Sequence, residues 1–184
     1  MKVYKDFKTA KWSGGTTTEL FIYPPTANFK KGDYSLRLSL ATIDKSETVF
    51  TPKPDVERHL MVLNGPISLS HNNKDYELFA PFRVSKFKGD DLTKSKGIGR
   101  VLNLMFKQTC QGQLEMVSLA ENQNLLINQE NNKTLLFSIN GNLLVKHANH
   151  QTELNANQLA ELTNLSTEIK ASSNCSFIIV RSNV

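Results

Sequence analysis

Short runs of apolar or alternating residues, separated by turn residues, follow one another along almost the whole chain. In residues 34–43, every second residue from Leu36 to Leu40 is leucine, with Arg37 and Ser39 between them. Because successive side chains of a strand point to opposite faces, this alternation separates a leucine face from a polar face. Long helical patterns are nearly absent. The pattern therefore predicts an all-β fold, a sandwich or a barrel, with few short helices.

The same criteria place strands along the rest of the chain. Further strands are predicted at residues 59–63, 67–70, 75–79, 82–87, 100–107, 112–120, 124–127, 133–139, 142–146, 151–154, 158–162 and 175–181. The pair Asn64-Gly65 stands between two of these runs and predicts a tight hairpin, because both central residues of such a turn need a positive φ. Residues 158–165 fit either a strand or a helical turn.

The two halves of the chain resemble each other when residues 76 positions apart are aligned. Asn64-Gly65 then meets Asn140-Gly141, and His71 meets His147. Chance similarity between two polar hairpins is the alternative. A genuine repeat means two copies of one β-unit. The fused double β-barrel called a bicupin is its natural candidate, because closing a sheet into a barrel removes exposed edges.

On this interpretation the chain is one double-cupin domain spanning residues 1–184. It would consist of two β-barrel or jelly-roll halves, at about residues 1–110 and 111–184. The oligomeric state stays open, with a homodimer as one option.

Composition and charge exclude several classes of protein. Hydrophobic residues make up 39% and charged residues 21% of the chain, as in ordinary globular proteins. The formal net charge of +5 is spread out, and the densest lysine cluster is interrupted by Asp90 and Asp91. We therefore expect no nucleic-acid partner. Residues 1–6 lack the pattern of a signal peptide and no apolar run reaches the roughly 20 residues of a membrane span, so we expect a cytoplasmic protein with no membrane partner.

The sequence offers no motif for a metal site or for common catalytic machinery. The four histidines include no His-x-His pair, which the metal site of many cupins needs, and the two cysteines form no CxxC motif. There is no G-x-S-x-G elbow, no P-loop and no GxGxxG motif. We therefore expect no metal, no cofactor and no assigned catalytic residue.

Three polar residues, Arg37, Arg58 and Asn103, stand in or next to apolar strands. If they face a barrel interior, they form a small anion-recognition pocket, because a buried guanidinium needs a partner and suits a carboxylate. The alternatives are that Arg37 faces solvent and that Arg58 forms a surface pair with Glu57.

The segment 12–19 is a further candidate for ligand contact. The single tryptophan, Trp12, precedes Gly14-Gly15 and a threonine cluster that includes Thr17. Glycine lets the backbone approach a ligand closely, and threonine hydroxyls both donate and accept hydrogen bonds. The alternative is a tight turn before a β-branched strand, with Trp12 packed into the core.

Together these segments resemble the HutD/Ves family over residues 10–107. The resemblance rests on six motifs in the family's order: Trp12, Gly14-Gly15, Thr17 and Glu19; Arg37, Ser39 and Ala41; Pro54, Glu57-Arg58 and Gly65; Pro81-Phe82; Gly89-Asp90; and Leu102-Asn103-Leu104-Met105. Two departures are visible. Gly14 stands where the family usually has asparagine, in a turn about two residues shorter. His59 replaces the usual apolar residue, and its alternation with Arg58 predicts that it points away from the pocket.

The resemblance implies a metal-free bicupin with no established enzymatic activity and a regulatory or metabolite-sensing role in histidine utilisation. It implies a small carboxylate ligand, such as formylglutamate or urocanate. The residues carried over to its pocket are Trp12, Thr17, Glu19, Arg37, Arg58 and Asn103.

Two other hypotheses stay open. The protein could be a metal-independent isomerase or epimerase acting on a small polar metabolite, with Glu19 as base and His59 as a weaker partner, both within ~3 Å of one substrate proton. It could instead be a protein-interaction subunit with a vestigial pocket, marked by a large exposed apolar patch. We expect a binding protein rather than an enzyme.

Overall fold

The computed structural model describes residues 1–128, 133–163 and 166–184. In these residues every regular element is a β-strand, and the strands pair in antiparallel fashion. The predicted all-β class is therefore confirmed, and the predicted short helices are not found among the described residues. No helix that could cross a membrane occurs in this part of the chain. The chain forms two compact units, an N-terminal unit of Phe7–Gly112 and a C-terminal unit of Gln113–Val184 together with Met1–Asp6.

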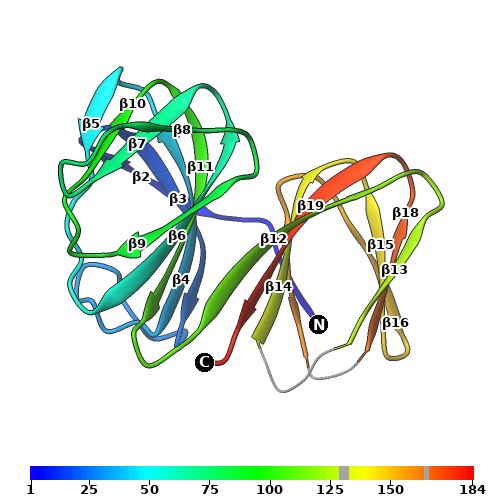
Figure 1. The fold of residues 1–184 in the computed structure, drawn as a ribbon. Helices are drawn as coiled ribbons and strands as arrows, with labels where there is room; N and C mark the ends of the chain where they lie inside the picture. Colours follow the sequence, from blue (N-terminus) through cyan, green and yellow to red (C-terminus); the bar gives the residue numbers. More distant parts are fainter. Residues whose placement is uncertain (129–132, 164–165) are drawn as a thin grey trace. The chain divides into compact units, whose positions relative to one another are not determined.

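The N-terminal unit is built from two antiparallel sheets (Figure 1). The larger sheet contains, in spatial order, β2 (Lys8–Trp12), β3 (Gly15–Tyr23), β4 (Leu36–Ile43), β11 (Gly99–Lys107), β6 (Val56–Asn64) and β9 (Val84–Lys88). The smaller sheet contains β5 (Glu47–Val49), β10 (Thr93–Lys96), β7 (Ile67–His71) and β8 (Glu77–Phe79).

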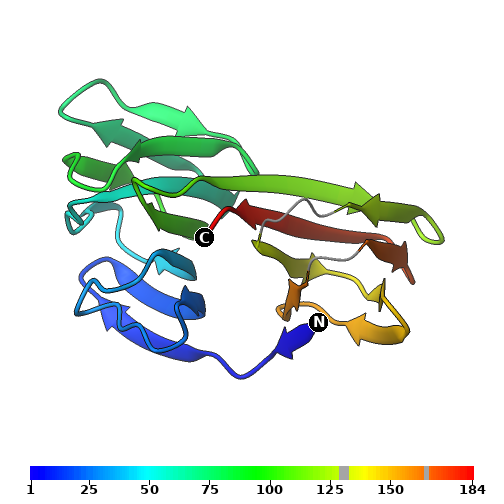
Figure 2. The same ribbon diagram turned by 90° about the horizontal axis from the view of Figure 1, so that it is seen from below.

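The C-terminal unit also has two sheets. Its five-stranded sheet contains β1 (Lys2–Tyr4), β17 (Leu159–Leu162), β14 (Lys133–Asn140), β19 (Cys175–Ser182) and β12 (Gly112–Leu119). Its four-stranded sheet contains β13 (Asn124–Ile127), β18 (Thr167–Ala171), β15 (Leu143–His147) and β16 (His150–Leu154). The first residues of the chain therefore complete a sheet of the C-terminal unit, where the blue strand β1 pairs with the orange strand β17 (Figure 2).

The two units share one strand order, and equivalent strands begin 73 to 77 positions apart. The order β4-β11-β6-β9 in one unit matches β12-β19-β14-β17 in the other, and β5-β10-β7-β8 matches β13-β18-β15-β16. Leu36 and Gly112 begin β4 and β12, and Ile67 and Leu143 begin β7 and β15, both at a spacing of 76. The N-terminal unit adds β2 and β3 to the shared plan, whereas the C-terminal unit adds β1.

Apolar side chains from both sheets fill the interior of each unit. In the N-terminal unit, Leu60, Val62 and Val101 of the larger sheet pack with Ile67 and Leu69 of the smaller one, and none is more than 2% exposed. Burying such a side chain contributes about 1.5–3 kcal/mol. The corresponding cluster of the C-terminal unit includes Leu136, Leu143, Val145, Phe177 and Ile179.

The Asn-Gly turns do not form the predicted hairpins. β6 and β7 lie in different sheets, as do β14 and β15, so each turn joins strands that are not paired. Gly65 and Gly141 do have positive φ angles of 87° and 69°. Asn64 closes its corner, because its Oδ1 accepts a hydrogen bond from the backbone N–H of Arg100 at 3.0 Å. The positive φ was predicted correctly for the two glycines but not for Asn64 and Asn140, and the chain passes from one sheet to the other at each turn.

The strands predicted from the sequence are present, with boundaries shifted by up to three residues. Residues 159–162 form β17, which decides the ambiguous segment in favour of a strand, while residues 164–165 lie outside the described part. The strands β1, β2, β5, β10 and β18 had no predicted counterpart, and β3 appeared only in the alternative explanation of segment 12–19. Except for β3, these strands have at most five residues. In β10 the buried positions are Thr93 and Ser95, so the alternation is carried by hydroxyl residues rather than apolar ones.

Gly65→Ala is expected to lower the free energy of unfolding by about 2–4 kcal/mol. The new Cβ would meet the carbonyl of Ile98, in addition to the strained φ. Gly32→Ala is the matched control, because Gly32 has a φ of 71° but no atom within 4 Å of an added Cβ. This control is expected to lose only about 1 kcal/mol. Urea unfolding monitored by circular dichroism measures both, and equal losses would show that the corner packing contributes nothing.

Candidate ligand-binding site

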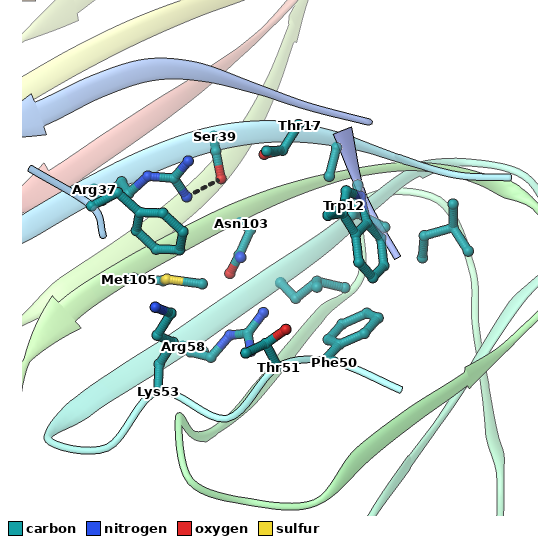
Figure 3. Close-up of a pocket in the computed structure, with 15 residues that line it drawn as sticks. Trp12, Thr17, Arg37, Ser39, Phe50, Thr51, Lys53, Arg58, Asn103 and Met105 are labelled. Carbon is teal, nitrogen blue, oxygen red and sulfur yellow. Dashed lines mark hydrogen bonds between the residues drawn. The ribbon is translucent and has the colours of Figure 1, made fainter. Parts of the chain in front are cut away.

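A cavity of about 180 Å³ lies against the larger sheet of the N-terminal unit (Figure 3). Its walls come from β2, β3, β4, β6 and β11, from the segment after β5, and from the connection between β3 and β4. Aromatic and aliphatic side chains, among them Trp12, Phe29, Phe50, Leu60 and Met105, form much of the lining. The polar lining residues are Thr17, Arg37, Ser39, Thr51, Lys53, Arg58 and Asn103.

The pairing register of three neighbouring strands brings the two arginines to this cavity. Met105 of β11 is the register partner of both Arg37 on β4 and Arg58 on β6. Neighbouring strands lie about 4.8 Å apart, so the two arginine Cα atoms are separated by roughly 10 Å. Two residues earlier on β11, Asn103 lies between Ser39 and Leu60. Because residues two apart share a face, both guanidinium groups and the Asn103 amide face the cavity.

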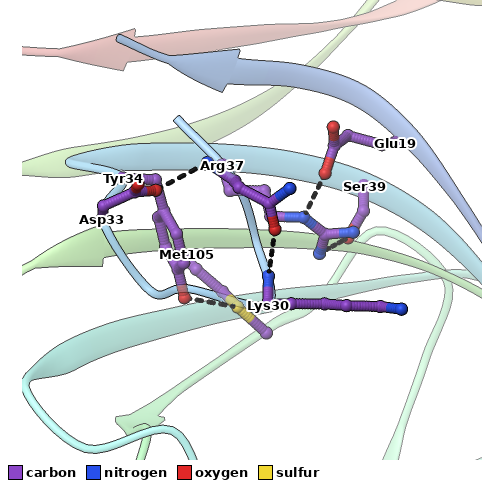
Figure 4. A network of polar contacts seen from close by, with 8 residues as sticks. Glu19, Lys30, Asp33, Tyr34, Arg37, Ser39 and Met105 are labelled. Atoms are coloured by element: carbon purple, nitrogen blue, oxygen red, sulfur yellow. Dashed lines mark hydrogen bonds and ion pairs between the residues drawn. The ribbon is translucent and has the colours of Figure 1, made fainter. Parts of the chain in front are cut away.

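Arg37 is a buried cation that already has a counter-charge (Figure 4). Its Nε donates a hydrogen bond to Oε2 of Glu19 at 2.8 Å, and its Nη1 donates to Oγ of Ser39 at 3.1 Å. The Arg37 side chain is 4% exposed and that of Glu19 is 34% exposed. Its Cζ lies 3.9 Å from the centre of the Phe29 ring, in a cation–π contact. A guanidinium has five N–H donors, so donors remain for a ligand.

Arg58 is a buried cation without a counter-charge. The residue is 5% exposed, its Nε has no hydrogen-bond partner in the described structure, and no described carboxylate pairs with it. Its Cζ lies 5.3 Å and 5.0 Å from the ring centres of Phe50 and Phe87. Burial lowers the pKa of Arg58 to about 10, an effect that Tyr34 opposes and the charge of Arg37 reinforces. The group therefore stays protonated at neutral pH, and a lone buried cation is a strong candidate for anion binding.

Asn103 adds an unpaired acceptor to the same face. It is 7% exposed, and its Oδ1 has no hydrogen-bond donor among the described residues. A buried amide oxygen left unpaired costs about 1–3 kcal/mol. The position can therefore accept a hydrogen bond from an N–H or O–H group of a ligand.

The glycine turn makes Trp12 a wall of the cavity. The Nε1 of Trp12 donates to the carbonyl oxygen of Thr16 at 3.1 Å, and its ring meets Phe50 edge-on with ring centres 5.8 Å apart. A Cβ at Gly14 would overlap the Trp12 ring, so this glycine makes room for the indole. Trp12 packs on the apolar core and lines the cavity at the same time.

Of the six residues predicted for the pocket, Trp12, Thr17, Arg37, Arg58 and Asn103 line the cavity. Glu19 does not line it and instead holds Arg37. The geometry brings these residues together, and their role in binding stays a prediction.

His59 also lies outside the cavity lining, as its alternation with Arg58 predicts. It is buried, and its ring meets Phe106 edge-on at 5.0 Å between ring centres. The isomerase hypothesis needs Glu19 and His59 at one substrate proton. Neither residue lines the cavity, so the structure does not assemble this acid–base pair there.

Sequence analysis missed lining residues that come from connecting segments. Phe29 lies between β3 and β4, and Thr51 and Lys53 follow β5. Nζ of Lys53 lies 4.3 Å from the centre of the Phe29 ring. No periodic pattern marks such positions, and the one available signal was that Lys53 directly precedes the Pro54 motif.

The described residues do not assemble a metal site. No three side chains of histidine, cysteine, aspartate or glutamate in residues 1–128, 133–163 and 166–184 are placed to hold a metal ion. The cavity lining contains none of these residue types. The donors that many cupins use for a metal therefore do not fit this cavity.

The equivalent positions of the C-terminal unit are filled differently. Thr134 and Ile179 occupy the positions of Arg58 and Asn103, each 76 residues further on, and both are 1% exposed. Ile179 belongs to the apolar core of its unit. The two units thus share a fold, while the buried guanidinium and amide at these positions belong to the N-terminal unit.

Two β-sandwich units of one strand order, with a cation-lined cavity in one of them, define a protein of the cupin fold. A cupin 2 conserved barrel domain protein from Leptotrichia buccalis superposes with a TM-score of 0.60 at 9% identity, covering 94% of this chain and 90% of that one. The protein PA5104 from Pseudomonas aeruginosa PAO1, of unknown function, superposes with a TM-score of 0.85 at 16% identity, covering 100% and 98%.

HutD from Pseudomonas fluorescens SBW25 superposes with a TM-score of 0.73 at 18% identity, covering 97% of each chain. The HutD family model matches residues 4–178. The chain belongs to the HutD family, as the sequence motifs indicated. A search of curated proteins finds no match.

Arg58→Met is expected to raise the free energy of unfolding by about 1–3 kcal/mol, because an apolar side chain of similar length replaces a lone buried cation. Arg83→Met is the control, since the Arg83 side chain is 52% exposed and pairs with Glu77 at the surface. It should change stability by less than about 0.5 kcal/mol. Urea unfolding at neutral pH measures both. A less stable Arg58→Met variant would mean that Arg58 is compensated in the folded protein.

His59 is expected to make the protein less stable as the pH falls from about 6.5 to about 4. Burial, reinforced by Lys86, lowers the pKa of His59 to about 4. In this window the unfolded chain binds a proton that the folded histidine does not, so stability falls with pH.

Relative to His59→Leu, the wild-type protein should therefore lose about 2 kcal/mol between pH 7 and pH 5. Urea unfolding at both pH values checks this, with His150→Gln at an exposed position as control. Parallel pH profiles of wild type and His59→Leu would contradict the assignment.

Proposed function

We propose that this HutD-family protein binds a small carboxylate between Arg37 and Arg58. The observation that carries the proposal is the buried Arg58 guanidinium, which faces a cavity and has no counter-charge among the described residues. A ligand carboxylate would supply that charge and accept the N–H donors that the protein leaves free. Hydrogen bonds between a guanidinium and a carboxylate are among the strong ones in proteins.

The other lining residues narrow the kind of ligand. Oδ1 of Asn103 can accept a hydrogen bond from an N–H or O–H group of the ligand, because no described residue donates one to it. Trp12 and Phe50 offer an apolar wall for a short carbon body. The volume of about 180 Å³ restricts the ligand to a small metabolite. Formylglutamate, with two carboxylates, and urocanate, with one, both combine a carboxylate with an N–H group and are the candidates we favour.

Family membership supports a role in histidine utilisation. The solved HutD from Pseudomonas fluorescens SBW25 was obtained in a formate condition, and formate is the simplest carboxylate. We propose that binding of such an acid serves a regulatory purpose and that the protein acts in the cytoplasm. No described residue pair in the cavity supplies a general acid and base, so we propose binding rather than turnover.

Isothermal titration calorimetry with formate, formylglutamate and urocanate tests the proposal. The wild-type protein should bind at least one of these acids, and Arg58→Met should weaken that binding by about thirtyfold or more, because a buried hydrogen-bonded charge pair is lost. Arg37→Ala should weaken it as well. Arg83→Ala, at a surface position of the same unit, should leave the affinity unchanged.

A thermal-shift screen of the metal-stripped protein with divalent metals runs beside the calorimetry. A ligand that binds only the folded state raises the melting temperature. Stabilisation by metals alone, or equal affinity in the wild type and the Arg58→Met variant, would contradict the proposal.

A further inference from the structure

The charged side chains that line the cavity are all cations. Three cations line it, Arg37, Lys53 and Arg58, and no carboxylate does. Among the described residues, Glu19 is the carboxylate that pairs with one of these cations, through Nε of Arg37 at 2.8 Å. Lys53 is half-buried and forms no ion pair with a described residue. The two buried guanidinium groups together with Glu19 therefore carry a single net positive charge.

Contacts other than the ion pair with Glu19 also orient Arg37. Ser39 accepts a hydrogen bond from Nη1 of Arg37 at 3.1 Å, and the Phe29 ring lies 3.9 Å from its Cζ. Both contacts hold the guanidinium from sides other than Nε. A neutral glutamine at position 19 would also keep an oxygen that can accept the Nε–H hydrogen bond. What Glu19 adds, beyond a hydrogen bond, is a negative charge behind the site.

We propose that Glu19 is a specificity-determining residue, because its bond to Arg37 outside the cavity leaves the two buried arginines one net positive charge to match one ligand carboxylate. The inference rests on the proposed carboxylate site and names the charge that this site accepts. A second anionic group inside the cavity would meet no buried cation that is still uncompensated. The second carboxylate of formylglutamate would therefore have to reach Lys53, where water screens the attraction, whereas urocanate has a single carboxylate and fits the charge of the site better.

The consequence for Arg58 follows from Coulomb interactions. Arg37 and Arg58 repel each other across Met105, and the charge of Arg37 lowers the pKa of Arg58. Glu19 reduces this repulsion while the cavity is empty and opposes the entry of a further negative charge when it is filled. Charges several ångströms apart at the edge of a protein interior change an affinity by about tenfold.

The test compares formate and oxalate as mono- and dianionic probes, in calorimetry at low ionic strength near neutral pH. In Glu19→Gln the affinity for oxalate is expected to rise about tenfold and that for formate about threefold, so the oxalate-to-formate ratio increases. Glu47→Gln is the matched control, because Glu47 belongs to the same unit and pairs with Lys96 at the surface, with a side chain that is 68% exposed. Both affinities should stay at their wild-type values in this control.

The outcomes separate this inference from the proposed function. Formate binding by the wild type, with an unchanged ratio in Glu19→Gln, leaves the carboxylate site standing and removes Glu19 as its charge determinant. A fall in both affinities by the same factor would mean that Glu19 only orients Arg37, and would overturn the inference. Absence of wild-type binding to every acid tested removes the proposed function and this inference with it. An equal rise of the oxalate-to-formate ratio in Glu47→Gln would mean that the overall charge of the protein causes the effect, and would overturn the inference.

Discussion

The structure of the candidate site depends on the antiparallel register of β4, β11 and β6. This register sets Arg37 and Arg58 on either side of Met105, so two like charges face one small cavity. Backbone hydrogen bonds along three long strands hold that arrangement. A guanidinium repelled by its neighbour and removed from water would otherwise turn towards solvent. The paired strands thus hold a charge arrangement that is unfavourable in itself, which is the form that a preorganised anion site takes.

The internal repeat shows that the candidate site replaces apolar core packing with buried polar groups. Both units use the same strand order, yet Ile179 in the C-terminal unit stands where the N-terminal unit has Asn103. The C-terminal position adds to an apolar core, whereas the N-terminal position leaves a buried acceptor unpaired. Real proteins break the rules of core packing mainly at functional sites. The contrast between equivalent positions in one chain therefore supports a function for the N-terminal cavity.

The two histidines of the internal repeat have local hydrogen-bond partners, in contrast to the buried arginine of the site. The Nδ1 atoms of His71 and His147 lie 3.0 Å and 2.7 Å from the hydroxyls of Thr93 and Thr167. These two histidines occupy equivalent positions of the repeat and have hydroxyl partners in both units, so they belong to the shared fold. Arg58 breaks this pattern, and Glu19 compensates only the other arginine.

The sequence by itself determined the all-β class, most strand positions, the spacing of the repeat and five of the residues that line the cavity. It did so because alternation and turn chemistry are local properties, and because the family motifs mark Trp12, Arg37, Arg58 and Asn103. Only the tertiary structure decided that the Asn-Gly turns join different sheets, that Lys53 reaches the cavity and that Glu19 lies behind Arg37. Those facts depend on which strands pair and which connections fold over the sheet. Such contacts between distant residues do not produce a periodic pattern of apolar and polar residues in the sequence.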